Sequence, residues 1–290
     1  MQDFQFCTTT SLQEAVELYS EYADRCKIIA GGTDLVPSLR NEEIHPDYVL
    51  NILEIDELQG IREKENVVHI GPTTTFTDMA NSEILHRYIP LLAQAASNVG
   101  GPQIRNRGTI GGNIITASPA ADVLPAIIAL DCELELRSKV SGSRLLPAAK
   151  TIEAPYSTYL KPDEILTGII IKKQRTGTRC VFEKLGRRDA MARALINMSV
   201  IMSVEKDNVI SDLRIVPGAL MPVARRIHSA EKILEGKVPS ARLIQSASEV
   251  FVNELEGVWS PEYKIPVARN LFIRIITSLL SMKYEDRGLA

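Results

Sequence analysis

The chain contains the stretch Arg105-Asn106-Arg107-Gly108-Thr109-Ile110-Gly111-Gly112-Asn113 and, much earlier, the stretch Ala30-Gly31-Gly32-Thr33-Asp34-Leu35. Each stretch holds two adjacent glycines and a threonine hydroxyl. Because glycine reaches positive φ without steric cost, each glycine pair can turn successive backbone N–H groups toward one anion. Two such segments facing one another would suit a diphosphate. The sequence therefore favours a dinucleotide ligand.

The earlier stretch follows a short apolar run and precedes a possible helix. Asp34 stands where that helix would begin, and Pro37 is tolerated in its first turn. An anion at this end would meet free N–H groups and the positive end of the helix dipole. The Asp34 carboxylate would repel a phosphate unless it turned away to cap the helix. An ordinary strand–turn–helix corner is the alternative interpretation.

The later stretch continues into a run of small residues that ends at Asp122. Asp122 could accept hydrogen bonds from ribose or ribityl hydroxyls. Alternatively, it is the N-cap of the helix that runs through Ile127 and Leu130. Both interpretations stay open at this point.

Several familiar site types are disfavoured. Neither glycine stretch is a GxGxxG segment with an acidic residue about 20 positions later, as a Rossmann site needs. The chain has no GxxxxGK(S/T) segment and no GxSxG segment. It also offers no candidate general base, so we predict no catalytic residue in this chain.

Composition excludes other classes. The 290 residues allow a large core and two or three domains. A net charge of -3 argues against a non-specific nucleic-acid binder. No apolar run approaches the roughly 20 residues of a membrane span, and the first residues do not resemble a signal peptide. We therefore expect a cytoplasmic protein.

The cysteines and histidines show no metal-ligand spacing. Cysteines stand at positions 7, 26, 132 and 180, and histidines at 45, 69, 86 and 228. Without a CxxC or HExxH segment, zinc or iron–sulfur ligation within this chain is not expected. The cysteines are interpreted as single buried thiols.

Hydrophobic patterning predicts three successive units of mixed helix and strand. Ser11 and Glu14 form a capping box for a first helix, and Thr77 or Asp78 could cap a later one. The Asp207-Asn208 turn predicts an antiparallel hairpin, and helices follow Ser229. Strands are expected at 27–30, 48–52, 67–71, 132–136 and 164–172, and a helix at 91–99. The fold class is α+β.

Several stretches of the chain resemble segments of a known protein family. AGGTDLVPSLR and QIRNRGTIGGNIITASPAADVLPA are similar to segments of the FAD-binding (medium) subunit of the molybdenum hydroxylases, which include the xanthine dehydrogenases. The likeness extends to Ile70-Gly71-Pro72-Thr73-Thr74, to Phe182-Glu183-Lys184-Leu185-Gly186-Arg187-Arg188-Asp189-Ala190-Met191 and to Ser260-Pro261-Glu262-Tyr263.

The resemblance implies a fold and a set of cofactor residues. The fold is a vanillyl-alcohol-oxidase-like (PCMH-type) FAD-binding domain of two subdomains, at 1–57 and 58–176, followed by a smaller α+β domain at 177–290. The diphosphate would lie between the two glycine stretches. Leu166 and Lys184 would lie near the isoalloxazine ring. The other implied FAD residues are Ile28, Ile29, Ala30, Gly31, Gly32, Thr33, Asp34, Leu35, Gly100, Thr109, Ile110, Gly111, Gly112, Asn113 and Asp122.

The resemblance also implies partners. A large subunit would carry the molybdenum cofactor and hydroxylate the substrate. A small subunit would carry two 2Fe–2S clusters and pass electrons to FAD in this chain, which would reduce NAD or another acceptor. The substrate is expected to be a purine or related N-heterocycle on family likeness alone. The scattered cysteines argue against the hydroxybenzoyl-CoA reductase branch, whose flavin subunit holds an additional cluster.

Two alternatives compete with the electron-transfer subunit. One is a self-contained flavoenzyme of related fold, for which the 15 aromatic residues supply no obvious substrate pocket. The other is a binding module that keeps FAD only as a structural element or has lost it. The visible spectrum and the turnover of the isolated chain distinguish the three.

Overall fold

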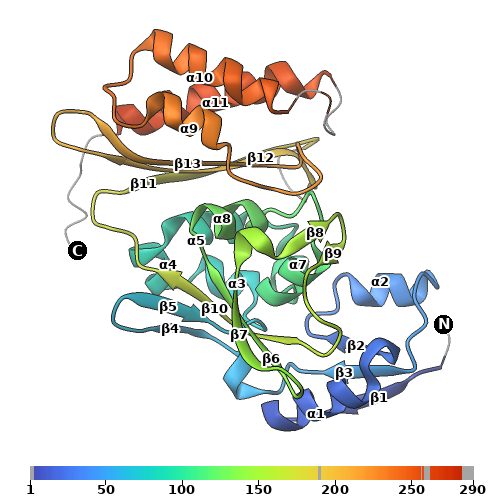
Figure 1. Cartoon of the computed structure of the whole chain (residues 1–290). Helices are drawn as coiled ribbons and strands as arrows, with labels where there is room; N and C mark the ends of the chain where they lie inside the picture. The colour runs from blue at the N-terminus through green and yellow to red at the C-terminus, as the bar shows by residue number, and fades with distance from the viewer. Residues whose placement is uncertain (1–2, 189–190, 256, 258–261, 283–290) are drawn as a thin grey trace.

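The computed structural model describes residues 3–188, 191–255, 257 and 262–282. Four positions quoted above for the family resemblance, Asp189, Ala190, Ser260 and Pro261, lie outside the described residues. Along the described chain, a small parallel sheet comes first, a larger antiparallel sheet second and a three-stranded sheet third (Figure 1).

The first sheet forms the N-terminal layer. Its strands run in the order β1 (Gln5–Thr8), β3 (Tyr48–Asn51) and β2 (Cys26–Ile29), and all are parallel. The predicted strands at 27–30 and 48–52 are confirmed to within one residue. Helix α1 (Leu12–Tyr22) and the short α2 (Leu35–Arg40) connect these strands, together with the 3-10 turn η1 (Ala23–Arg25). The parallel order directs the end of β2 toward the rest of the molecule.

The predicted capping box of α1 is only half formed. The hydroxyl of Ser11 accepts a hydrogen bond from the Glu14 N–H at 3.3 Å. The carboxylate of Glu14 instead accepts from the Thr9 hydroxyl. Thr9 competes successfully because its own oxygen also accepts from the Ser11 N–H, which the box would have used.

The second sheet is antiparallel and has the order β4-β5-β10-β6-β7. The strand bounds are Ile61–Glu63, Val67–Ile70, Ile165–Lys172, Glu133–Ser138 and Gly142–Pro147, and the 3-10 turn η2 (Asp56–Leu58) precedes β4. This confirms the strands predicted at 67–71, 132–136 and 164–172. Beyond β7 come the turn η3 (Ala148–Lys150) and the hairpin of β8 (Ile152–Ala154) and β9 (Ser157–Thr158).

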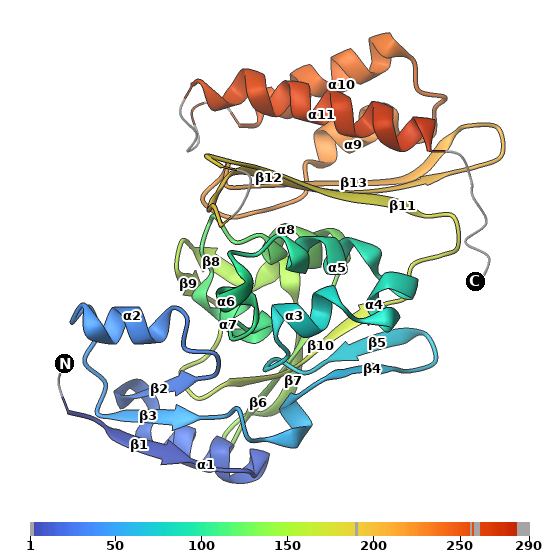
Figure 2. The ribbon, with the colours of Figure 1, turned by 180° about the vertical axis from the view of Figure 1, so that it is seen from behind.

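Six short helices lie against one face of this sheet (Figures 1 and 2). They are α3 (Phe76–Ala80), α4 (Glu83–Tyr88), α5 (Pro90–Ser97), α6 (Pro102–Arg105), α7 (Ile110–Thr116) and α8 (Val123–Ala129). The helix predicted at 91–99 is α5. The prediction that Thr77 or Asp78 caps α3 was wrong. Thr75 is the N-cap of this helix, and Asp78 completes a capping box with it. A threonine two positions earlier was overlooked.

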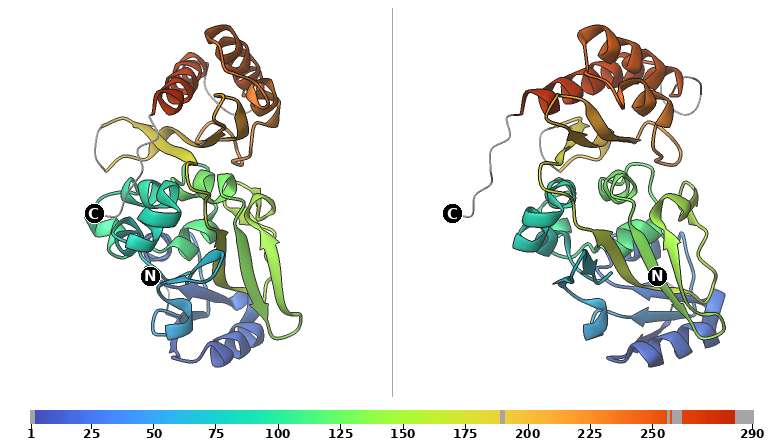
Figure 3. Two further views of the ribbon diagram at one scale, coloured as in Figure 1. Left: turned by 90° about the vertical axis from the view of Figure 1, so that its left-hand side faces the viewer. Right: turned by 60° about the vertical axis from the view of Figure 1, so that its left-hand side comes forward.

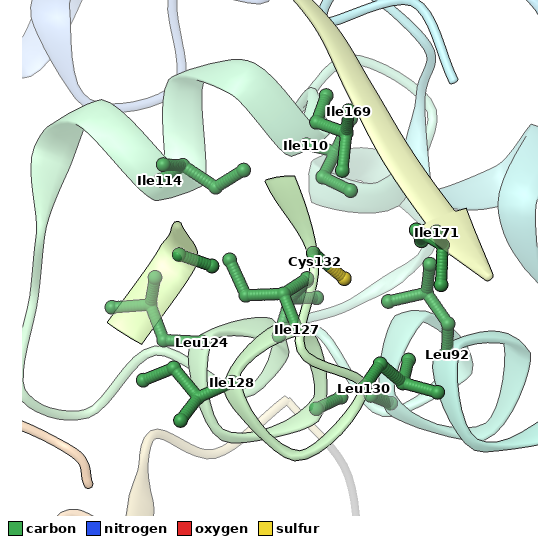
Figure 4. Packing of buried hydrophobic residues seen from close by; sticks show 14 of the residues in the cluster. Leu92, Ile110, Ile114, Leu124, Ile127, Ile128, Leu130, Cys132, Ile169 and Ile171 are labelled. Carbon is green, nitrogen blue, oxygen red and sulfur yellow. The ribbon is translucent and has the colours of Figure 1, made fainter. Parts of the chain in front are cut away.

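A continuous apolar core lies between these helices and the sheet. Ile169 and Ile171 of β10 point toward the helices, where Leu92, Ile110 and Ile127 meet them (Figure 4). Every residue of α8 is buried, so this helix is enclosed on all sides. An enclosed helix holds its first turn in place, which matters because Asp122 immediately precedes it.

The third sheet has the order β11-β12-β13 and is antiparallel, with bounds Arg179–Gly186, Ala194–Val204 and Ile210–Gly218. The predicted hairpin is confirmed in β12 and β13. Helices α9 (His228–Leu234), α10 (Ala241–Asn253) and α11 (Lys264–Ser281) cover one face, and α5 and α8 lie on the other (Figures 1 and 3).

Strand β12 alternates between these two sides. Met198, Val200 and Met202 belong to the core beneath α9–α11. Ile201 belongs instead to the core of the second sheet, so Asn197 and Ser199, four and two residues before it, face α8. Both polar residues are fully buried between the sheet and α8. The α+β class is confirmed, whereas the boundaries 57/58 and 176/177 stay predictions. Within the described residues, none of the helices combines the length and apolar character needed to cross a lipid bilayer.

Candidate functional site

The first glycine stretch forms the corner between β2 and α2. Gly32 takes a left-handed φ of 73°, so a side chain there would strain the backbone. The N–H groups of Gly31, Gly32, Thr33 and Asp34 have no hydrogen-bond acceptor among the described residues. Gly31, Gly32 and Thr33 are half-buried and Asp34 is exposed, and N–H groups at the start of a helix have no intrahelical acceptor, so these four can donate to an external acceptor. This corner fits the anion cradle that the sequence predicts.

Asp34 does not cap α2, contrary to the arrangement considered from the sequence. It occupies the N-cap position without a side-chain hydrogen bond to the helix. Its Oδ2 accepts instead from the Thr116 hydroxyl at 3.2 Å, at the far end of α7. The carboxylate thereby links the β2–α2 corner to the second sheet's helices, a contact that only the tertiary structure brings about.

The second glycine stretch is the start of a helix rather than an open loop. Thr109 is the N-cap of α7, and its Oγ1 accepts from the Gly112 N–H at 3.2 Å. The Ile110 N–H donates to Thr74 O at 3.1 Å, and the Gly111 N–H donates to Pro72 O at 2.8 Å. The expectation of exposed N–H groups at these three positions was therefore wrong, because the segment at 72–74 accepts two of them.

Two polar groups at this helix start remain for a ligand. The Thr109 N–H has no acceptor among the described residues. The Oδ1 atom of Asn113 is buried and has no donor. Gly111 is required for a different reason than a free N–H group, because a Cβ there would lie 2.6 Å from the Pro72 side chain. The start of α7 thus packs tightly against residues 72–74, and it leaves the Thr109 N–H and the Asn113 Oδ1 unpaired.

The two stretches contact each other. A Cβ on Gly31 would lie 1.8 Å from the carbonyl oxygen of Arg107, which is an impossible distance for any side chain. Only glycine permits this approach. The 75 residues between Gly31 and Arg107 are folded so that the two segments face one another, as a ligand shared between them would need.

Three other predicted positions form a second group. Lys184, on β11, places its Nζ 2.6 Å from Oδ2 of Asp122, and both side chains are almost completely buried. The same Nζ donates at 2.8 Å to the carbonyl oxygen of Asn98, two residues before Gly100. An ammonium carries three donors. The third has no acceptor among the described residues and is available to a ligand.

Asp122 does not serve as a helix cap. It occupies the N-cap position of α8, but its side chain makes no capping hydrogen bond. Burial raises the pKa of this carboxyl above its usual range, against the opposing influence of Lys184 and of the Asn197 amide. A carboxylate that is buried without capping its own helix is held there by partners from another sheet, which favours the functional interpretation over the capping one.

The remaining predicted positions lie in or near the strands. Leu166 is buried in β10 and belongs to the core of the second sheet. Ile28 and Ile29 end β2, and Ile29 would touch a Cβ on Gly32. Ala30 packs against the N-terminal core, and Leu35 begins α2. The place of Leu166 near an isoalloxazine ring stays a prediction.

Two residues escaped the sequence argument. The Nδ2 of Asn197 donates to Asp122 Oδ1 at 3.0 Å, and Gly218 faces Asn197 on the neighbouring strand. An alternating strand with a polar residue on an otherwise buried face was the available signal. Its meaning depended on knowing that this face meets α8.

The described residues contain no cluster of three or more His, Cys, Asp or Glu side chains suited to a metal ion. None of the four cysteines forms a disulfide, and Cys26 and Cys132 are buried. Cys7 and Cys180 are half-buried, so the expectation of four buried thiols was correct for two of them. A cleft of about 370 Å³ opens beside α6 and is lined by residues that include Thr77, Asn81, Ser97, Arg105 and Asn106. None of the predicted cofactor residues lines it.

Comparison with known proteins decides the family. The profile described as "FAD binding domain in molybdopterin dehydrogenase" matches residues 2–173, more than half of the chain. The profile described as "CO dehydrogenase flavoprotein C-terminal domain" matches residues 181–279. This chain belongs to the family of FAD-binding medium subunits of molybdenum hydroxylases. The resemblance noted from the glycine stretches is confirmed.

Individual relatives agree with this family. The nicotinate dehydrogenase FAD-subunit of Eubacterium barkeri is 35% identical over 240 residues, 81% of each chain. The carbon monoxide dehydrogenase medium chain of Hydrogenophaga pseudoflava is 31% identical over 281 residues, 95% of this chain and 96% of that one. A solved structure of carbon monoxide dehydrogenase from the same organism superposes with a TM-score of 0.90 at 30% identity, covering 96% and 97% of the two chains. As a family member, the chain is the flavoprotein component of an oxidoreductase.

The residues present fit an FAD. Four unpaired N–H groups at Gly31–Asp34 suit a diphosphate, and the glycine at 31 admits close contact between the two segments. The orphaned Oδ1 of Asn113 and the unused donor of Lys184 add an acceptor and a cation. These groups come from the β2–α2 corner, α7 and β11, so an FAD that used all of them would join three separate parts of the chain.

Proposed function

We propose that this chain is the electron-transfer subunit of a multi-subunit molybdenum hydroxylase of the xanthine dehydrogenase type. It would take electrons from iron–sulfur clusters on a small partner subunit and pass them through FAD to NAD or another acceptor. A large subunit with the molybdenum cofactor would act on the substrate.

The observation that carries this proposal is the approach of Gly31 to Arg107. It sets the free N–H groups of Gly31–Asp34 opposite the start of α7, where Thr109 has an unpaired N–H. Amide N–H groups that converge on one place bind phosphate oxygens through hydrogen bonds without a full positive charge. We assign the diphosphate to this contact, with Asn113 as an additional polar partner.

The second group of residues would act on the redox end of the FAD. When FAD is bound, it accepts electrons and passes them on. Lys184 would place a positive charge close to it, and a nearby cation favours the more negative, reduced form. Asp122 would accept a hydrogen bond from a ribityl hydroxyl while keeping Lys184 in position. Gly100 and Leu166 would contribute shape rather than charge.

The visible spectrum of the purified chain tests the proposal. We expect flavin absorption with stoichiometric FAD, rapid reduction by dithionite and no steady turnover of a substrate by the chain alone. A colourless chain that takes up no added FAD would contradict the proposal. Sustained turnover without partner chains would favour the self-contained flavoenzyme instead.

The partners and the acceptor require a separate experiment. Affinity purification of the chain from its own cells should recover a molybdenum-containing chain and an iron–sulfur chain. The reduced complex should then be mixed with NAD, a quinone and oxygen in turn, and the rate of flavin reoxidation compared. Recovery of the chain alone under gentle conditions would speak against the complex.

A further inference from the structure

A row of three residues crosses the third sheet on the face toward α8. Lys184 of β11 pairs with Asn197 of β12, and Asn197 pairs with Gly218 of β13. Residues in direct register share one face of an antiparallel sheet. The row therefore presents a cation, an amide and a gap to the same place, where α8 begins with Asp122.

Asn197 and Lys184 bind different oxygens of the Asp122 carboxylate. The Nδ2 of Asn197 donates to Oδ1 at 3.0 Å, whereas Lys184 binds Oδ2 at 2.6 Å. The same Nδ2 donates to the Ala121 carbonyl oxygen at 3.2 Å, which ties the side chain to the backbone beside Asp122. Each carboxylate oxygen thus has one fixed donor, so the plane of the carboxylate cannot rotate freely.

Gly218 supplies the space that this arrangement needs. A Cβ on Gly218 would lie 2.0 Å from Asn197 Oδ1 and 2.6 Å from the Pro125 side chain. Asn197 is fully buried, and its Oδ1 has no hydrogen-bond donor. An unpaired buried amide oxygen is costly. It persists here beside an amide nitrogen that is fully used, which indicates that the nitrogen end determines the side chain's position.

We propose that Asn197 is a positioning residue of the FAD site, acting through Asp122. It holds the carboxylate in the orientation in which one oxygen binds Lys184 and the remaining lone pairs point to the ligand. Gly218 is part of the same device because it leaves room for the amide. This inference rests on the proposed function, since it concerns the same FAD.

A double-mutant cycle on the dissociation constant of FAD tests the proposal. Asn197→Leu keeps the approximate volume and removes the donor, and it is measured in the wild-type chain and in Asp122→Ala by quenching of flavin fluorescence. Because a hydrogen bond to a charged group is lost, Asn197→Leu should raise the constant about tenfold in the wild-type background. In Asp122→Ala the same change should raise it less than about threefold, since coupled residues are not additive.

Ser199 provides the matched control. It is a fully buried polar residue on the same face of β12, two residues on, and its hydroxyl has no partner. Ser199→Ala should change the dissociation constant less than about twofold in either background. If Asn197→Leu costs the same in both backgrounds, or no more than Ser199→Ala, Asn197 has only a structural role and the proposal fails.

Two substitutions keep the cycle interpretable. Asn197→Ala replaces Asn197→Leu if the leucine variant does not fold, because a smaller side chain cannot crowd Gly218. Asp122→Leu, which likewise offers no acceptor to Asn197, replaces Asp122→Ala if the alanine variant does not fold, with the same threshold. A wild-type chain that binds no FAD overturns the proposed function together with this inference, whereas normal wild-type binding with additive costs overturns the inference alone.

Discussion

Lys184 carries its charge against a carboxylate, and this pairing determines the electrostatic potential that it presents to its surroundings. The Nζ of Lys184 and Oδ2 of Asp122 lie 2.6 Å apart in a nearly dry environment. Burial strengthens their mutual attraction and at the same time makes each charge expensive without the other. Replacement of one partner therefore affects both stability and the local electrostatic potential.

Lys184→Ala should leave FAD bound but lower its reduction potential. The cation that favours the reduced form is lost, and a tenfold change in the redox equilibrium corresponds to about 30 mV for two electrons. Spectroelectrochemical titration of the purified chain measures this shift. Lys173→Ala is the control, because Lys173 is also ion-paired, with Glu63 at 2.6 Å, but outside the site. A potential that stays unchanged in Lys184→Ala would remove the assigned role.

Gly31→Ala should abolish FAD binding. Its Cβ would meet the Arg107 carbonyl at 1.8 Å, so the β2–α2 corner and the start of α7 must separate. Overpacking of this kind costs about 1–3 kcal/mol of stability. Gly236→Ala is the control, since Gly236 has a φ of 72° and open space around it, and its replacement strains the backbone away from the site. Equal FAD binding by the two variants would contradict the shared cradle.

At the scale of elements, the arrangement of strands determines which polar contacts cross between them. Arg144 of β7 reaches Glu164, just before β10, through bonds of 2.6 and 2.8 Å to its two carboxylate oxygens. The Lys161 N–H donates to the same carboxylate at 2.8 Å. This two-point contact stabilises the edge of the second sheet beside the turn that leads into β10.

Glu164→Gln should make the free energy of unfolding fall less steeply as the pH decreases into the acid range. Burial raises the pKa of Glu164, but the Arg144 guanidinium and the Lys161 N–H outweigh it, so the pKa lies below its usual value of 4.5. The stability that this depressed pKa supplies is present above pH 4.5 and is lost as the pH falls through the folded-state value. Denaturant unfolding between pH 3 and 7 measures the difference.

At neutral pH the same variant should lose about 2 kcal/mol, because charge-assisted hydrogen bonds become neutral ones. Glu249→Gln is the control, since Glu249 pairs with Arg269 on exposed surface and surface pairs contribute little. If the free energy of unfolding falls as steeply with decreasing pH in Glu164→Gln as in the wild type, other carboxylates dominate this pH dependence.

At the scale of the whole molecule, the proposed ligand site draws on three separate parts of the chain. The free N–H groups lie at 31–34, the orphaned amide oxygen on α7 and the buried cation on β11. Arg214 of β13 also donates to the Ala129 carbonyl oxygen at 3.1 Å, which holds the third sheet against the end of α8. A ligand that touches all three parts opposes their separation.

FAD should therefore raise the melting temperature of the ligand-free chain. At a free concentration of one hundred times the dissociation constant, binding adds about 2.7 kcal/mol, or a shift of about 5 °C. Differential scanning calorimetry measures it. Riboflavin lacks the diphosphate and should give a much smaller shift at the same concentration. Equal shifts with the two flavins would place the binding energy outside the amide cradle.

Much of the fold could be predicted from the sequence, because local patterns determine local structure. The alternation in β5, β6 and β10 and the helical spacing in α5 identified those elements. Adjacent glycines at 31–32 and 111–112 marked the places where backbone must approach closely. The family was identified because these two stretches resemble segments of its known members.

What the sequence alone determined is therefore the set of elements, the α+β class and the two segments suited to a diphosphate. Only the tertiary structure decided which N–H groups remain free, since Pro72 and Thr74 accept from α7 and nothing described accepts at 31–34. It also decided that Asp122 binds Lys184 and Asn197 instead of capping α8. These outcomes depend on partners 36 to 75 positions away, and hydrogen-bond competition across such distances is settled by packing, which no local pattern encodes.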